Sequence, residues 1–190
     1  MALELLNGPA SEPISLAEAK AHLRVDSSDE DDLISSLITT SRLQVEAALG
    51  LALITQQWVQ RADCWPLSGV VELSLRPLIS VDEVRVLDAE GTATALDDIS
   101  YAVDKNGDRP RLTSRTGYWP LPGARLNGIE IDFTAGFGTT AATVPNDVCR
   151  ALLGLVAHWF EHRGADALRT PPPIPKSVSA LLMPYRPVRL

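Results

Sequence analysis

The sequence has little of what points to export, membrane insertion or cofactor chemistry. Its 190 residues include two cysteines, three histidines and only 5% aromatic residues. No apolar run approaches the roughly 20 residues that span a bilayer, and no signal peptide precedes Pro9. We therefore expect a chain that stays in the compartment where it is made. Because Cys64 and Cys149 lie far apart and no export signal is seen, we expect free thiols rather than a disulfide.

Basic residues are also scarce relative to acidic ones. Seventeen Lys and Arg stand against 24 Asp and Glu, which gives a formal net charge of −7. A protein that binds nucleic acid without sequence preference needs clustered positive charge that displaces counterions. The composition therefore argues against such binding. The composition does not exclude a protein that DNA moves past without being bound.

Helical signals lie at both ends of the sequence. Ser15 and Glu18 have capping-box spacing and predict a short helix through about Leu23. A longer apolar face with 3.6-residue periodicity predicts a helix from about Asp29 to Leu49, with Gly50 as its stop. Its acidic run, Asp29 to Asp32, lies where the helix dipole favours negative charge. Further helices are predicted from Pro145 to about Gly164 and over Lys176–Met183.

Between the helical segments the pattern changes to short strands. In residues 128–134 apolar and polar side chains alternate, which predicts one buried and one wet face. The predicted strands are Ile54–Arg61, Val70–Leu75, Val81–Leu87, Ser100–Val103, Arg111–Ser114 and Gly128–Thr134.

These elements predict an α+β fold. We expect a small helical bundle formed by residues 1–53 and 139–165, with a strand-rich insertion at 54–138 between the second and third main helices. In the same division, residues 166–190 are expected to form a proline-rich C-terminal docking arm. Six of the 14 prolines fall in the last 26 residues. Proline fixes φ and removes a hydrogen-bond donor, so the first part of the arm is expected to be a stiff, extended spacer.

The search for chemistry finds no catalytic constellation, and we expect neither an enzyme nor a cofactor. His158 and His162 have the spacing of two metal ligands on one helix, but the glutamate that a metalloprotease needs is misplaced and no third ligand is evident. A metal-dependent hydrolase using this pair remains an alternative. The glycines of Gly136-Phe137-Gly138 fit a turn or bulge better than a phosphate cradle.

A set of short motifs, in order across nearly all of residues 13–188, resembles the phage-type head–tail connector (adaptor) proteins of tailed phages, prophages and gene transfer agents. Residue 162 departs from the pattern, because His162 stands where an asparagine-like residue is expected. The matching stretches include Pro13–Asp26, Asp31–Ile34, Leu53–Trp58, Leu75–Leu78, Phe133–Gly138, Val144-Pro145, Leu155–Arg163 and Leu181–Arg186.

The resemblance implies a structural protein of the virion or phage-like particle. Such adaptors form a ring, usually of twelve subunits, between the portal of a DNA-filled head and the next head-completion or tail protein. The DNA passes through the ring without sequence-specific binding, and no membrane is involved. A head-completion stopper or a tail-terminator protein is the main alternative.

The resemblance also implies that the C-terminal arm reaches toward the portal. The alternative is that the arm folds back over its own helices, as terminal segments often do. The residues that we expect to bind the portal or a neighbouring subunit are Leu181, Leu182, Met183, Tyr185, Arg186 and Arg189.

Overall fold

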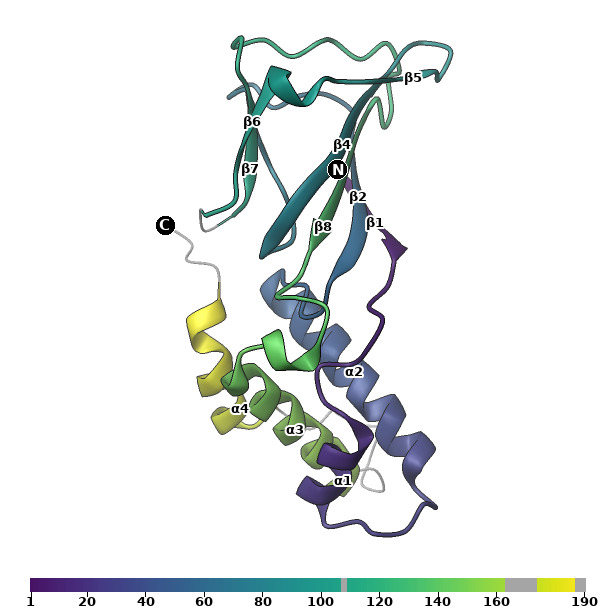
Figure 1. Ribbon diagram of the computed structural model, residues 1–190, viewed down its shortest axis with the longest axis vertical. Coiled ribbons are helices and arrows are strands. Elements are labelled where there is room, and N and C mark those ends of the chain that lie inside the picture. Colours follow the sequence, from purple (N-terminus) through teal and green to yellow (C-terminus); the bar gives the residue numbers. More distant parts are fainter. Residues whose placement is uncertain (107–108, 163–173, 187–190) are drawn as a thin grey trace. The chain divides into compact units, whose positions relative to one another are not determined.

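The computed structural model describes residues 1–106, 109–162 and 174–186. Contacts within the chain separate it into two compact units, one built from residues 1–9 and 50–137 and the other from residues 10–49 and 138–190. The described residues form four α-helices and two antiparallel sheets, which confirms the α+β prediction (Figure 1). Among them, no helix is long and apolar enough to cross a membrane.

The first unit contains a five-stranded and a three-stranded sheet. The larger sheet has the strand order β1-β2-β8-β4-β5, and each neighbouring pair is antiparallel. The smaller sheet has the order β3-β7-β6. A short 3₁₀ helix, η1 (Asp98–Ser100), precedes β6. The strands are β1 (Ala2–Asn7), β2 (Gln56–Ala62), β3 (Val70–Glu72), β4 (Leu78–Leu87), β5 (Ala93–Ala95), β6 (Tyr101–Asp104), β7 (Arg111–Ser114) and β8 (Ile129–Ala135).

Strand β8 organises the core of this unit. Ile129, Ile131 and Phe133 are buried on one face, and the residues between them lie on the other face, which confirms the predicted alternation. The buried face belongs to an apolar cluster that includes Leu112 of the smaller sheet. The two sheets therefore share one core, because each buries its apolar face in the same cluster.

The second unit contains the helices α1 (Leu16–Leu23), α2 (Asp31–Leu49), α3 (Asn146–Glu161) and α4 (Lys176–Leu182). Two short 3₁₀ helices, η2 (Ala141–Thr143) and η3 (Met183–Tyr185), lie in the same unit. The predicted capping box of α1 is present: the Glu18 N–H donates to Ser15 Oγ at 3.2 Å, and the Ser15 N–H donates to Glu18 Oε2 at 2.8 Å. These bonds hold the pKa of Glu18 below its ordinary value, with the backbone bond from Ser15 as the main cause.

Helix α2 carries a buried ion cluster that the sequence did not indicate. Its periodicity placed Arg42 and Glu46 beside or opposite the apolar face, yet their exposed fractions are only 7% and 8%. Arg42 Nε donates to Glu12 at 2.7 Å, and Arg42 Nη1 donates to Glu46 at 2.9 Å. The carboxylates compensate the buried guanidinium, which explains why a charge is tolerated there.

Strand β1 was not predicted. It pairs with β2, whose partner residues lie 50 to 59 positions further along the chain, and all six of its residues are exposed. It lies within residues 1–53, where the sequence predicts the helical bundle, although its contacts place it in the β-rich unit. Gly50 ends α2 at a positive φ of 63°, as the predicted stop requires.

Candidate functional site

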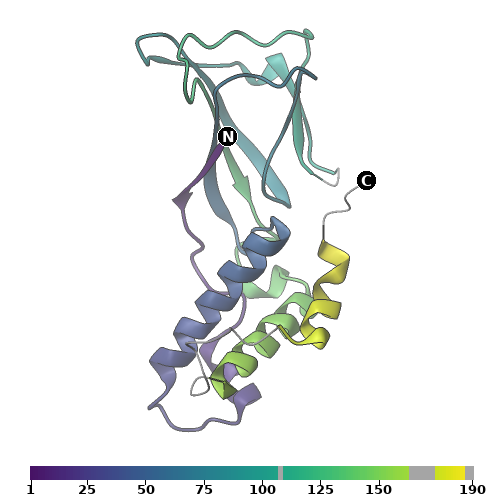
Figure 2. The same ribbon diagram turned by 180° about the vertical axis from the view of Figure 1, so that it is seen from behind.

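The C-terminal segment 174–186 is the described part of the predicted docking arm, and it packs against α3. Helix α4 begins directly after Pro175. Val178 and Leu182, four residues apart and therefore on one side of the helix, are only 3% and 9% exposed. A Cβ atom placed on Gly154 of α3 would lie 3.0 Å from Val178 Cγ2. The absence of a side chain at Gly154 thus lets the two helices approach closely (Figure 2).

A hydrogen bond attaches the end of the arm to the first turn of α3. The Tyr185 hydroxyl donates to Asp147 Oδ1 at 2.8 Å. Burial and this bond to Asp147 raise the pKa of Tyr185 to about 12. The phenol therefore keeps its proton, and its donor role, at neutral pH.

The six residues predicted to bind a partner do not share one environment. Leu182 is buried, and Leu181 and Tyr185 are half-buried. Met183 is 67% exposed, and Arg186 is also exposed. Arg189 lies outside the described residues. The arm therefore has an inner side, applied to α3, and an outer side that Met183 and Arg186 present to solvent.

A second candidate surface is the polar face of the five-stranded sheet. Arg61 of β2 and Arg85 of β4 lie opposite Glu130 of β8, one on each side. Arg61 Nε donates to Glu130 at 2.8 Å, and Arg85 Nη2 donates to it at 3.0 Å. These bonds outweigh burial, which acts in the other direction, and hold the pKa of Glu130 below its ordinary value.

This network extends to a locally irregular part of β4. The β4–β8 register shifts between Val81 and Glu83, so β4 has one extra residue there. Asp82 accepts a bond from Thr134 at 2.7 Å, and Arg85 bonds both Glu83 and Asp132. Glu4 of β1 adds a bond to Arg61. Four carboxylates pair with the two arginines, so this network is acidic as well as cross-linked.

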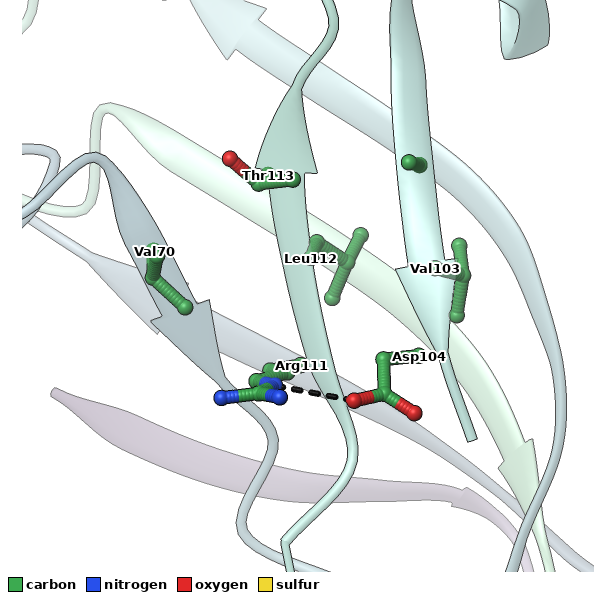
Figure 3. A pocket seen from close by; sticks show the side chains of 7 residues that line it. Val70, Val103, Asp104, Arg111, Leu112 and Thr113 are labelled. Carbon is green, nitrogen blue, oxygen red and sulfur yellow. Dashed lines mark hydrogen bonds and ion pairs between the residues drawn. The ribbon is translucent and has the colours of Figure 1, made fainter. Parts of the chain in front are cut away.

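The three-stranded sheet has a shallow depression of about 280 Å³, shown in Figure 3. Val70 and Thr113 line it from neighbouring strands, and Arg111 Nε donates to Asp104 at 2.9 Å across its lower end. The depression is open, and both side chains of this ion pair are exposed. The other residues that line it are uncharged.

Two tryptophans join the loops at one end of the β-rich unit. The rings of Trp65 and Trp119 stack with their centroids 4.2 Å apart. Trp65 Nε1 donates to the carbonyl of Pro120 at 2.7 Å, and Trp119 Nε1 donates to that of Gly69 at 2.9 Å. These two rings therefore pack against each other and hold the loops together.

The histidine pair also has a local explanation. The rings of His158 and His162 lie 4.4 Å apart, and His162 Nδ1 is 2.7 Å from the carbonyl oxygen of His158. Within residues 1–106, 109–162 and 174–186, no three His, Cys, Asp or Glu side chains are grouped so that they could hold a metal ion. Cys64 and Cys149 are free thiols, and burial raises the pKa of Cys149.

Known proteins resemble this chain in sequence and in structure. Residues 13–102 match the family model described as the phage gp6-like head–tail connector protein. Over these residues the chain is similar to the head–tail connectors of phages. Solved structures match along the whole chain. No curated protein sequence matches it significantly.

Two of the solved structures that resemble this chain come from gene transfer agent (GTA) particles. One is a chain from the neck of an empty GTA particle computed with C6 symmetry, with 27% identity and a TM-score of 0.85. Another is from the neck of a native GTA particle computed with C12 symmetry, with 26% identity and a TM-score of 0.84. Each match covers 100% of this chain and 97% of the other chain.

Proposed function

We propose that this chain is a structural adaptor at the neck of a phage-like particle, where it joins the portal of a DNA-filled head to the tail. The observation that carries the proposal is the whole-chain similarity to neck proteins of GTA particles at 26–27% identity. The relative from a neck with C12 symmetry supports a ring of twelve copies. The chain acts by binding its neighbours and has no enzymatic role in this proposal.

The outer side of the C-terminal arm is the proposed contact with the portal. Val178, Leu182 and the Tyr185–Asp147 bond fix the arm on α3. This fixation orders Met183 and Arg186 before any partner arrives, so less conformational entropy is lost on docking. A flexible apolar side chain beside a guanidinium provides contact area and a charged hydrogen-bond donor for an acidic partner surface.

The charge of the chain fits a neck through which DNA travels. With a net charge of −7, the protein has no excess of cations to bind phosphates and slow the movement of DNA. The acidic face of the five-stranded sheet contributes to this balance, since Arg61 and Arg85 are already occupied by carboxylates.

The arm contact is best tested with substitutions on the outer side, because deleting the arm uncovers the side of α3 that it packs against. In Met183→Ser/Arg186→Glu, both changes fall on exposed side chains, so we expect normal folding. Particles purified from producing cells should contain filled heads that lack tails. A matched control is Leu43→Ser, which changes an exposed apolar residue on α2, and it should give complete particles.

Three outcomes are informative. Complete particles from the double variant would show that the outer side of the arm is not the portal contact. Absence of the wild-type chain from purified particles would refute the adaptor function itself. A density map in which another ring separates this chain from the portal would favour a stopper or tail-terminator role instead.

A further inference from the structure

The two edges of the five-stranded sheet are both exposed. β1 and β5 are its terminal strands, and in the described residues neither has a strand on its outer side. Edge strands of soluble proteins are usually short, or protected by lysine, proline or a covering element. β1 is six residues long and contains neither lysine nor proline. Its leucines Leu3, Leu5 and Leu6 are 37%, 45% and 46% exposed. It is therefore suited to pairing with another strand.

The leucines of β1 lie on a defined face of the sheet. Leu3 is opposite Gln60 and Leu5 is opposite Trp58. These β2 residues are in turn opposite Ile131 and Phe133, whose side chains form the core. Because directly opposed residues share a face, Leu3 and Leu5 extend the apolar face of the sheet to its edge. Both remain exposed there.

The other edge offers a matching apolar surface on the same face. Thr94 of β5 is opposite Val86, which is opposite Ile129 of the core. Beside it lies a groove of about 400 Å³. The uncharged residues that line this groove include Val86, Leu87, Thr94, Leu96, Pro120 and Leu121. The three residues of β5 are exposed, small and uncharged, so its backbone is accessible to an incoming strand.

The directions of the two edges are also compatible. Four antiparallel steps separate β1 from β5, so the two strands run the same way. Rotation about an axis that runs along the strands preserves this direction. The β1 edge of one copy can therefore meet the β5 edge of the next as a parallel pair, with Leu3 and Leu5 beside the groove.

We propose that neighbouring copies of this chain join edge to edge, with β1 of one copy pairing with β5 of the next to continue the sheet around the ring. The inference rests on the proposed function for the presence of neighbouring copies. The inference adds the identity of the two surfaces that meet. The contact is heterologous, as a closed ring of more than two identical subunits requires. Glu4 is already paired with Arg61, so the pairing brings no uncompensated charge to the edge.

The exposed area explains why this contact belongs to an assembled ring and not to a free dimer. Fully burying a leucine removes on the order of 100 Å² from water. With the exposed fractions of Leu3, Leu5 and Leu6, the edge offers roughly 130 Å² of leucine surface. A stable interface buries about 800 Å² per partner. We therefore expect a monomer in isolation, with strand pairing only where the portal holds the copies side by side.

Cysteine cross-linking within particles tests the pairing. The background is Cys64→Ser, which removes the exposed native thiol. Thr94→Cys is then combined with Leu3→Cys or with Leu5→Cys, because the two positions sample two registers on one face. Paired strands bring their Cα atoms within the distance that a disulfide needs. After oxidation, a non-reducing gel of purified particles should show a ladder of covalent multimers for at least one pair.

Matched controls separate this contact from others. Each variant that carries only one of the introduced cysteines should give no ladder, since a heterologous contact does not place a residue against itself and the half-buried Cys149 is present in every variant. Leu3→Cys with Ala102→Cys, which lies on the edge strand β6 of the smaller sheet, should also give none. A ladder from this pair, or dimers from Leu3→Cys alone, would overturn the pairing of β1 with β5.

The second measurement is a density map of the wild-type neck, which does not depend on any variant being assembled. The backbones of β1 and the neighbour's β5 should lie about 4.8 Å apart. A map with the chain in place and β1 facing solvent, or monomers only after oxidation of assembled particles, overturns the strand pairing alone. Absence of the chain from the neck overturns the adaptor function and this inference with it.

Discussion

Replacing Gly136 by alanine should destabilise the β-rich unit strongly. Gly136 follows the last residue of β8 and has a φ of +145°, where side chains are rarely tolerated. A Cβ atom there would lie 2.6 Å from the backbone nitrogen of Thr55 and 2.7 Å from its Cα. The strained φ costs about 1–3 kcal/mol, and the forced shift of packed backbone costs about 1–3 kcal/mol more. The expected loss of unfolding free energy is therefore roughly 2–6 kcal/mol.

Urea unfolding followed by tryptophan fluorescence measures this loss, because Trp58, Trp65 and Trp119 all lie in the β-rich unit. The matched control is Gly91→Ala. Gly91 also has a positive φ, of 86°, but among the described residues no atom beyond its chain neighbours lies within 4 Å of the place that a Cβ would take. Its replacement should cost only about 1–2 kcal/mol, the penalty of the backbone conformation. Equal losses in the two variants would refute the steric argument, and a smaller loss at Gly136 would refute the whole explanation.

Three further predictions concern single contacts. Glu130→Gln should flatten the decline of stability in acid, measured by urea unfolding from pH 6 to pH 3. The folded pKa of Glu130 lies below its ordinary 4.5, so its stabilisation is present above that pH and is lost as the pH falls. Tyr185→Phe should remove a loss of arm protection between about pH 10 and 12, because the pKa of Tyr185 is raised from 10 to about 12 beside Asp147; hydrogen exchange of α4 reports it. Val178→Ala should increase exchange in α4 about tenfold or more by leaving a cavity against Gly154, with little effect on the β-rich unit.

The elements that the sequence predicted well depend on local signals. The Ser15–Glu18 capping box spans four residues, and the alternation in β8 repeats every two. Gly50 marks the end of α2 by its own backbone preference. Each pattern lies within the element that it specifies, so no knowledge of distant partners is needed.

The features that were missed depend on distant partners. β1 has no buried residue to produce a pattern, and it exists because β2 pairs with it. Arg42 is buried because Glu12, thirty residues earlier, accepts its hydrogen bonds. The Arg61–Glu130–Arg85 row depends on the register of three strands, and register is not readable from one strand alone.

For the C-terminal arm, the local sequence pattern predicts structure but does not decide function. Its sequence allowed two alternatives, folding back over its own helices or docking on a partner. In the structure Val178 and Leu182 are applied to α3, while Met183 and Arg186 remain exposed. A helix has two sides, so folding back with one side does not compete with docking through the other. Folding back fixes the outer side in place, and the entropy cost of ordering the arm then falls on folding instead of on assembly.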